Sequence, residues 1–430
     1  MCGADYSKGA AHMQKLIING GKKLGGEIRI QGAKNAALPI MAASVLCGEE
    51  IILHNCPRIS DVYSAMRILT YLGCKTGFED KNTAVIKAEN VSANGISDEL
   101  MREMRSSIFF LGAVLGRTGR CRITLPGGCD LGPRPIDIHL SALRKMGVTI
   151  REEFGVLDCS AENGLRGAKI SLSFPSVGAT ENIMLAAVLA EGTTVIQNAA
   201  REPEISDLAE FLTACGAKIS GAGCGKITIT GVKKLHGCEF TVMPDRIVCA
   251  TYLACTAAAG GELVASECRP SDMESILTVF EQMGCIVHSG ADKIYFSANR
   301  PLRAVTPIRT MVYPGFPTDA QAFVMAALCR AKGTSVFVEN IFENRFKHVG
   351  ELQRMGADIL VEGKVAVIEG VNRLYGAKTC AADLRGGAGL VAAALSAEGT
   401  SEISNIHFID RGYEEIEKAL SSVGADIRRE

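Results

Sequence analysis

A cysteine set between glycines is the strongest sign of chemistry in this sequence. Cys129 lies in the segment LPGGCDLGPRPIDIHL (125–140), with three glycines close to it and Arg134 five residues further on. An exposed, mobile thiol beside a cation has the environment in which thiols become reactive. Unlike the other fifteen cysteines, Cys129 lies outside any apolar helix or strand pattern. We therefore interpret it as a functional thiol and not as an inert loop residue.

Arginines recur at matching places in loops that lead from a strand into a helix. There are six of them: Arg58, Arg134, Arg201, Arg269, Arg345 and Arg411. A helix N-terminus and a guanidinium group both suit anions. Pairing with neighbouring acids, for example of Arg201 with Glu202 or Glu204, would account for about half of the set. Convergence of the others across a cleft would create an anion pocket in a neutral protein.

A second set of strand-to-helix loops carries a lysine and a carboxylate. Lys34 and Asn35 lie in GAKNAALP, at a Gly- and Ala-rich helix start that suits a phosphate contact. Lys34 could instead be a solvated surface lysine, but its small apolar neighbours favour the phosphate contact. Asp319 follows FPT at another predicted helix N-terminus, where composition alone favours an ordinary N-cap carboxylate.

A six-fold repeat positions these loops. An apolar helix end, a glycine and a strand recur at intervals of 68 to 74 residues, at Gly73, Gly147, Gly216, Gly284, Gly356 and Gly424. A second set of glycines, each about 25 residues upstream, follows Ala-rich helices: Gly48, Gly119, Gly192, Gly261, Gly333 and Gly399. Glycine at these helix ends predicts left-handed C-caps.

The repeat predicts helices inside and sheets outside. The Ala-rich helices are apolar nearly all round, whereas strands such as GEIRIQ and KITITG alternate apolar and polar residues. A chain of 430 residues is too long for one core. We therefore expect an α/β fold of two domains with three units each, dividing near 234–246. The predicted domains are 34–243 and 13–33 plus 244–430, with 1–12 as an extension outside both.

Composition excludes several classes of function. The 46 Lys and Arg residues balance 47 Asp and Glu residues, so nothing indicates binding to nucleic acid or to an anionic membrane. No apolar run reaches the roughly 18 residues of a membrane helix. The 16 cysteines show no CxxC spacing, which favours reduced core thiols and a cytoplasmic location. No metal-binding or cofactor-binding motif is present, and we expect neither a metal nor a cofactor.

Together these motifs resemble one family. GAKNAALP, LPGGCDLGPRPIDIH, SVGATENIM, FPTDAQA, FENRF, DLR and HFIDRGYE are similar to the UDP-N-acetylglucosamine 1-carboxyvinyltransferases of peptidoglycan synthesis, and they fall in that family's order. The similarity runs from about Lys15 to the last residues. It implies two inside-out α/β barrels, each of three βαβαββ-type units, with the N-terminal strand crossing back to the second domain.

The resemblance also implies a reaction and roles for the loop residues. Such an enzyme transfers the enolpyruvyl group of phosphoenolpyruvate to the 3′-hydroxyl of UDP-N-acetylglucosamine and releases phosphate. By similarity, the catalytic residues are Cys129, Asp319 and Lys34, with Cys129 as the general acid and the target of fosfomycin and Asp319 as the general base. The phosphoenolpyruvate residues would be Lys34, Asn35, Arg134, Arg345, Arg385 and Arg411. The sugar-nucleotide residues would be Asn35, Arg105, Arg134, Pro135, Ile136, Asp137, Ile138, Phe174, Pro175, Ser176, Val177, Asp319 and Ile341.

One segment departs from the family pattern, and related functions share the fold. In FPSV (174–177) other members of the family carry a lysine, so a charged contact is not expected there. The sister enzyme 5-enolpyruvylshikimate-3-phosphate synthase shares the fold and the donor, but the long PGGC loop argues against it. A sugar-nucleotide sensor without activity and a pure repeat scaffold would also fit the repeat, but the polar loop residues favour an enzyme. The glycines around Cys129 further predict a lid over 125–137 that closes when the sugar nucleotide binds.

Overall fold

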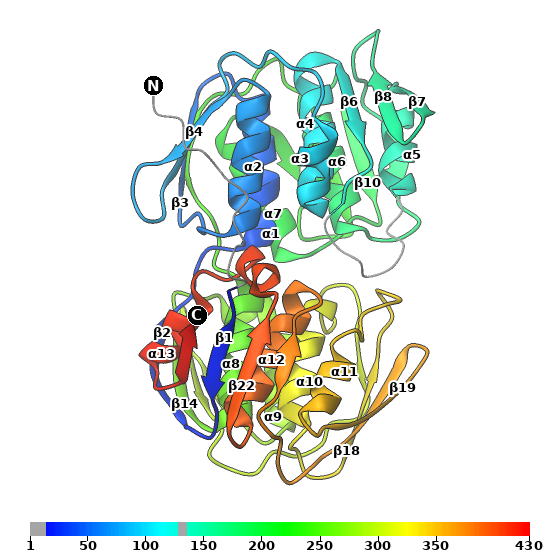
Figure 1. Cartoon of the computed structure of the whole chain (residues 1–430). Helices are drawn as coiled ribbons and strands as arrows, with labels where there is room; N and C mark the ends of the chain where they lie inside the picture. Colours follow the sequence, from blue (N-terminus) through cyan, green and yellow to red (C-terminus); the bar gives the residue numbers. More distant parts are fainter. Residues whose placement is uncertain (1–13, 128–135) are drawn as a thin grey trace.

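The chain forms two halves stacked one on the other (Figure 1). The computed structural model describes residues 14–127 and 136–430. The upper half in Figure 1 contains the blue to green part of the chain, and the lower half contains the green to red part. The dark blue strands β1 (Leu16–Asn19) and β2 (Leu24–Arg29) are the exception, because they belong to the lower half.

Within the described residues the strands form six sheets of one pattern. Each has three antiparallel strands, and five of the six add a parallel strand at one edge. The first half contains the sheets β13-β3-β5-β4, β6-β8-β7 and β11-β12-β10-β9. Their bounds are β3 (Glu50–His54), β4 (Lys75–Phe78), β5 (Ala84–Lys87), β6 (Arg120–Thr124), β7 (Thr149–Glu153), β8 (Val156–Ser160), β9 (Lys169–Ser171), β10 (Thr193–Gln197), β11 (Lys218–Ser220), β12 (Lys226–Thr230) and β13 (Cys238–Thr241).

The second half repeats the pattern with β15-β16-β14-β2, β17-β18-β20-β19 and β21-β22-β1-β23. The bounds are β14 (Gly261–Ser266), β15 (Ile286–Ser289), β16 (Lys293–Ser297), β17 (Ile308–Arg309), β18 (Thr334–Val338), β19 (Asp358–Glu362), β20 (Val365–Glu369), β21 (Lys378–Cys380), β22 (Thr400–Ser404) and β23 (Asp426–Arg429). In the smaller sheet β6-β8-β7, a parallel bridge between Gly95 and Arg122 takes the place of the edge strand.

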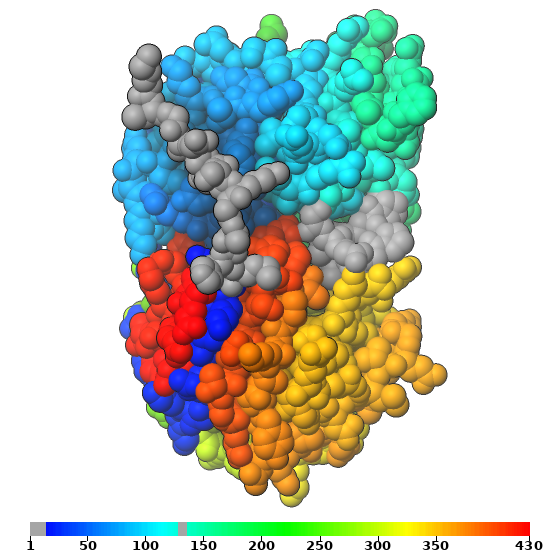
Figure 2. All heavy atoms as spheres, viewed as in Figure 1, coloured from blue at the N-terminus to red at the C-terminus, as the bar shows by residue number. Residues whose placement is uncertain are grey.

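The N-terminal strand completes the last sheet of the chain. Leu16 pairs with Ile403 on one side and with Arg429 on the other, so β1 lies between β22 and β23. The next strand, β2, pairs in parallel with β14. Figure 2 shows the same dark blue segment surrounded by red and orange atoms. The crossing of the N-terminus into the second half, which the resemblance implied, is confirmed.

Three helices fill the inside of each half. They are α1 (Lys34–Ala43), α4 (Phe109–Thr118) and α6 (Val177–Ala187) in the first half, and α8 (Arg246–Ala259), α10 (Gln321–Leu328) and α12 (Leu384–Ser396) in the second. In α8, for example, every residue except the last is buried. The strands around them expose one face, as the alternating burial of β6 and β10 shows. The predicted inside-out α/β arrangement is confirmed.

The remaining helices are amphipathic or short, and they pack one face against inner helices or strands while the other face is exposed. They are α2 (Ser60–Tyr71), α3 (Asp98–Glu103), α5 (Asp137–Lys145), α7 (Pro203–Ala214), α9 (Glu274–Gln282), α11 (Val349–Arg354) and α13 (Ile416–Ser422).

Glycine conformation follows the predicted repeat with one exception. All six glycines of the first set have φ between 91° and 100°, as a left-handed helix end requires. Five of the second set are also left-handed. Gly48 does not have a positive φ. There a 3-10 turn (Ser44–Leu46) leads into β3, and no left-handed residue is needed to end it. The prediction of a left-handed cap is therefore wrong at Gly48.

Two separate hydrophobic cores underlie the two halves. One contains buried residues from Ala33 to Met243. The other contains Leu16 to Ile30 together with Ile247 to Ile427. We propose that each core is a domain, with 34–243 as the first and 13–33 plus 244–430 as the second, and this division stays a prediction.

Candidate active site

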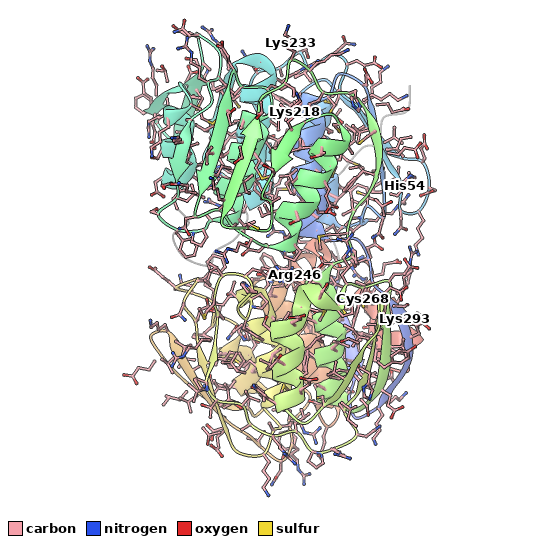
Figure 3. All side chains as sticks on the ribbon, turned by 180° about the vertical axis from the view of Figure 1, so that it is seen from behind. His54, Lys218, Lys233, Arg246, Cys268 and Lys293 are labelled. Atoms are coloured by element: carbon pink, nitrogen blue, oxygen red, sulfur yellow. The ribbon has the colours of Figure 1, made fainter. Side chains whose placement is uncertain are left out.

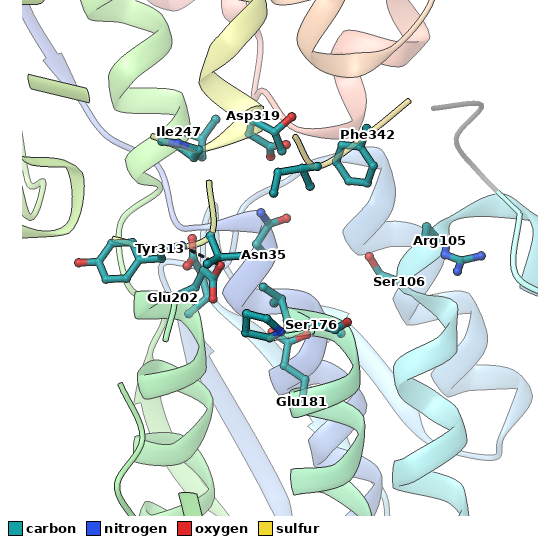
Figure 4. Close-up of a pocket in the computed structure, with 18 of the residues that line it drawn as sticks. Asn35, Arg105, Ser106, Ser176, Glu181, Glu202, Ile247, Tyr313, Asp319 and Phe342 are labelled. Atoms are coloured by element: carbon teal, nitrogen blue, oxygen red, sulfur yellow. Dashed lines mark hydrogen bonds between the residues drawn. The ribbon is translucent and has the colours of Figure 1, made fainter. Parts of the chain in front are cut away.

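A cavity of about 540 Å³ lies where the two halves meet (Figure 4). Helices α1 and α6 and the 3-10 helix Arg105–Ile108 line it from the first half. The 3-10 helix Thr318–Ala320, the N-terminus of α12 and the segment around Tyr313 line it from the second. Loops at the ends of buried helices therefore meet at one place, as the repeat requires.

Most of the predicted site residues line this cavity. They are Lys34, Asn35, Arg105, Asp137, Ile138, Phe174, Pro175, Ser176, Val177, Asp319, Ile341, Arg345, Arg385 and Arg411. Ile136 is buried beside the cavity but does not line it. Cys129, Arg134 and Pro135 lie outside the described residues, as does most of the segment predicted to form a lid. Three of the six repeated arginines, Arg58, Arg201 and Arg269, are exposed and do not reach the cavity.

Lys34 and Arg411 share a buried carboxylate. Lys34 Nζ lies 2.7 Å from Asp61 Oδ2, and Arg411 donates to both Asp61 oxygens at 2.8 and 3.2 Å. The side chains of Lys34 and Asp61 are 9% and 3% exposed, so Lys34 is not a surface lysine. Burial lowers the pKa of Lys34. Burial opposes ionisation of Asp61 too, but the two cations outweigh it and lower the pKa of that carboxyl.

Asp61 was not among the predicted site residues. It follows Arg58 in the segment NCPRISD and lies in the first turn of α2, where an acidic residue is typical for helix-dipole reasons alone. Its partner Arg411 belongs to the other half, 350 residues further along the chain. A contact over such a distance leaves no local signal. The ion pair fastens the two halves together at the site.

Asp319 is held by two arginines and is not a helix cap. Arg345 Nη2 donates to Asp319 Oδ1 at 3.1 Å, and Arg385 Nε donates to Asp319 Oδ2 at 3.2 Å. No side chain caps the 3-10 helix Thr318–Ala320, so the interpretation of Asp319 as an ordinary N-cap is wrong. Burial raises the pKa of Asp319, but Arg385, Arg345 and Lys34 together hold it well below its usual range.

The two arginines are fixed by further contacts. Arg345 donates twice to the carbonyl oxygen of Thr318, at 3.2 and 3.1 Å. Arg385 donates to the hydroxyl of Tyr413 at 3.2 Å, and that hydroxyl lies 2.8 Å from Thr251 Oγ1. Both guanidinium groups are almost fully buried, at 3% and 4% exposed. Asp319 is 28% exposed and is the member of this group that solvent or a ligand can reach.

Asp245 links the inner helices of the two halves. It caps α8 by accepting from the N–H groups of Ile247 and Val248 at 2.9 and 3.0 Å. Its other oxygen accepts from the N–H of Lys34 at 3.1 Å, at the start of α1. The motif MPDR belongs to another strand-to-helix loop of the repeat, but spacing along the chain does not predict a contact with Lys34. This contact places Lys34 at a defined position relative to the second half.

Three glutamates, Glu181, Glu202 and Glu204, also line the cavity. Glu204 makes two hydrogen bonds with Arg246, at 3.0 and 3.3 Å, and both side chains are buried. Arg246 lies where the halves meet, as Figure 3 shows from behind. Among the described residues the side chain of Arg201 forms no ion pair with Glu202 or Glu204, although its backbone N–H donates to Glu202 Oε2 at 3.0 Å. Burial raises the pKa of both Glu202 and Glu181.

The described cysteines are free, and most are buried, as predicted for core thiols. Cys224 and Cys380 are exposed. Cys224 lies in the glycine-rich turn GAGCGK between β11 and β12. The statement that Cys129 alone escapes the apolar patterns is therefore wrong, although Cys224 does not line the cavity. Across the described part of the chain, no group of three or more His, Cys, Asp or Glu side chains is arranged to hold a metal ion.

A comparison with family models identifies the class of protein. The model for EPSP synthase (3-phosphoshikimate 1-carboxyvinyltransferase) matches residues 18–420. The crystal structure of the enolpyruvyl transferase NikO from Streptomyces tendae superposes with a TM-score of 0.87 at 26% identity, covering 97% of this chain and 99% of that one. An EPSP synthase structure from Acinetobacter baumannii shares the fold at a TM-score of 0.74 and 18% identity, covering 97% of this chain and 100% of that one. The chain belongs to the EPSP synthase family.

Curated relatives define a narrower group within that family. UDP-N-acetylglucosamine 1-carboxyvinyltransferase 2 of Caldanaerobacter subterraneus subsp. tengcongensis is 52% identical over 417 residues, covering 97% of this chain and 100% of the relative. UDP-N-acetylglucosamine 1-carboxyvinyltransferase of Nitratidesulfovibrio vulgaris (strain DP4) is 47% identical over 418 residues, with the same coverage. None of the helices that the structure describes has both the length and the apolar character needed to cross a membrane.

Proposed function

We propose that this chain transfers the enolpyruvyl group of phosphoenolpyruvate to the 3′-hydroxyl of UDP-N-acetylglucosamine and releases phosphate. The reaction is the first committed step of peptidoglycan biosynthesis. One observation carries the proposal: Lys34, Arg345, Arg385 and Arg411 converge with the carboxylate of Asp319 on a single cavity between the halves. Sequence identity of about half with the two carboxyvinyltransferases supports the choice of acceptor.

The cations match the charge of the donor. Phosphoenolpyruvate carries a carboxylate and a phosphate, and guanidinium groups bind both in a bidentate manner. Asp61 and Asp319 keep these cations in place before the substrate arrives. We assign phosphoenolpyruvate binding to Lys34, Asn35, Arg345, Arg385 and Arg411, and by resemblance to Arg134.

Asp319 is assigned as the general base. It takes the proton of the 3′-hydroxyl as the sugar oxygen bonds to C2 of phosphoenolpyruvate, while Cys129 gives a proton to C3. Loss of a proton from C3 then expels phosphate and leaves the enol ether. The neighbouring cations Arg385, Arg345 and Lys34 hold the pKa of Asp319 low, which makes it a weak base. Because a bound anion offsets these cations, substrate binding would raise that pKa toward the value that proton transfer requires.

The first half is assigned to the sugar nucleotide. Helix α6 begins at Val177 and is capped by Ser176, whose hydroxyl accepts from the N–H of Ala179 at 3.3 Å. Its N-terminus faces the cavity and suits a diphosphate, with Arg105 on the neighbouring element. The other assigned contacts are Asn35, Arg134, Pro135, Ile136, Asp137, Ile138, Phe174, Pro175, Asp319 and Ile341. We also propose a cytoplasmic location, because most of the described thiols are free and buried.

A phosphate-release assay with two acceptors tests the function. We expect phosphate to be released from phosphoenolpyruvate when UDP-N-acetylglucosamine is present. With shikimate 3-phosphate, the acceptor of the sister enzyme, the rate should be lower by at least about 10³-fold, because a site built for other polar groups leaves them unpaired. Equal rates with both acceptors, or turnover with shikimate 3-phosphate alone, would refute the proposed acceptor. Binding of the sugar nucleotide without turnover would favour a sensor.

Cys129 is proposed as the thiol that fosfomycin alkylates. Mass spectrometry of the intact protein after incubation with the epoxide should show one adduct, and peptide mapping should place it on Cys129. Cys129→Ser should abolish the adduct. Cys224→Ser is the matched control, because Cys224 is exposed and, like Cys129 in the sequence, is set between glycines. An adduct that survives Cys129→Ser, or that disappears with Cys224→Ser, would contradict the assignment.

A further inference from the structure

Glu181 is a buried carboxyl in the cavity wall that has no protein partner. It lies one turn into α6, is 1% exposed, and lines the cavity. Neither of its side-chain oxygens makes a hydrogen bond. Buried polar groups are nearly always paired, so an unpaired one requires an explanation. The resemblance gave this residue no role.

The surroundings of Glu181 disfavour a negative charge. Glu202 and Glu204 are its acidic neighbours, and the buried cation Arg246 beside them is engaged by Glu204. Burial, together with these two glutamates, raises the pKa of Glu181 well above its ordinary value. A protonated carboxyl has one O–H donor and one carbonyl acceptor. It can therefore bind a neutral hydroxyl or amide but does not attract a cation or a phosphate.

The position of Glu181 fits the middle of a sugar nucleotide. Figure 4 shows it on the same side of the cavity as Ser176 and Glu202, with Asp319 on the opposite side and Asn35 between. The groups assigned to anions are the N-terminus of α6, one turn before Glu181, and the cations around Asp319 on the other side of the cavity. The part of the ligand that passes between them is the uncharged sugar, with its hydroxyl and acetamido groups.

We propose that Glu181 hydrogen-bonds to the hydroxyl or acetamido groups of the acceptor sugar and so contributes to its recognition. This inference rests on the proposed function. Glu181 acts in binding and not in proton transfer, because the reacting hydroxyl is assigned to Asp319. The acceptor sugar would then supply the hydrogen-bond partners that the protein does not provide.

Calorimetric titration of UDP-N-acetylglucosamine and of UDP into three proteins tests the inference. UDP has the uridine and the diphosphate but no sugar. Glu181→Leu removes the hydrogen bond at similar volume, and Glu181→Gln keeps a neutral donor and acceptor. We expect Glu181→Leu to weaken binding of UDP-N-acetylglucosamine by roughly tenfold and to leave binding of UDP unchanged. We expect Glu181→Gln to bind both ligands within about twofold of the wild type.

Thermal unfolding separates recognition from a structural role. Replacing an unpaired buried carboxyl with leucine should not lower the melting temperature, so weaker sugar binding in an equally stable protein supports the inference. The inference is overturned if Glu181→Leu binds UDP-N-acetylglucosamine like the wild type or weakens both ligands equally. It is also overturned if Glu181→Gln is as weak as Glu181→Leu. A wild-type protein that binds no UDP-N-acetylglucosamine would refute the proposed function instead.

Discussion

Asp319→Asn should reduce the rate of phosphate release by roughly 10²–10⁴-fold, the range expected for loss of a general base. Asparagine has nearly the same shape, but it keeps one acceptor oxygen where Asp319 offers separate oxygens to Arg345 and Arg385, and it cannot take a proton from the sugar hydroxyl. The measurement is the phosphate-release assay at saturating phosphoenolpyruvate and UDP-N-acetylglucosamine. The loss should appear in kcat, because the side chain acts in the chemical step.

Binding measurements distinguish this prediction from loss of the fold. Asp319→Asn should still bind UDP-N-acetylglucosamine, as titration calorimetry can show, and its unfolding should remain cooperative. Asp358→Asn is the matched control, since Asp358 is an exposed carboxylate on β19 and does not line the cavity. It should retain full activity. Turnover by Asp319→Asn within tenfold of the wild-type value would contradict the assignment of Asp319 as the base.

Asp61→Leu should be the most destabilising single change at the site. It leaves Lys34 and Arg411, both largely buried, without their shared carboxylate. Breaking a buried ion pair by removing one partner costs about 3–5 kcal/mol. We expect a loss of that size in the free energy of unfolding, measured by denaturant titration. We also expect a higher KM for phosphoenolpyruvate, because the two cations that would bind it lose their fixed positions.

Asp98→Leu provides the control for position in a helix. Asp98 also lies in the first turn of a helix and pairs with an arginine, Arg102, at 2.7 Å. That pair is exposed to solvent, so its loss should cost less than about 1 kcal/mol. If Asp61→Leu is no more destabilising than Asp98→Leu, the shared buried carboxylate does not fasten the two halves together.

The fold was largely predictable because its signals are local and repeated. A glycine that ends a helix and an alternating strand each leave a mark within ten residues, and six repetitions make the pattern unmistakable. Gly48 lacks the left-handed conformation of the other repeat glycines because a 3-10 turn replaces the helix end at that place. The position of β1 had no local signal, since its partners lie nearly 400 residues away. That crossing was expected only from the resemblance to a family.

The site residues also fall into two groups, those that the sequence indicated and those that it did not. Lys34 and the loop arginines stood out because charged residues are unusual beside small, apolar helix starts, whereas the role of Asp319 was implied only by the resemblance. Asp61, Asp245 and Glu181 did not stand out, because an acid near a helix N-terminus or within a helix has ordinary explanations. Asp319 was misinterpreted as a cap for the same reason. Its partners Arg345 and Arg385 follow 26 and 66 residues later, and only folding brings them together.

The place of β1 between β22 and β23 affects the order in which the molecule can be completed during synthesis. Along the chain β1 precedes the whole first half, yet both of its neighbours follow most of the second half. The core from Ala33 to Met243 contains no part of β1 or β2 and can form while translation continues. During that time β1 has unpaired backbone groups on both edges, which makes it a target for chaperones and for aggregation. The last sheet of the second half can therefore form around β1 only after β22 and β23 have both been made.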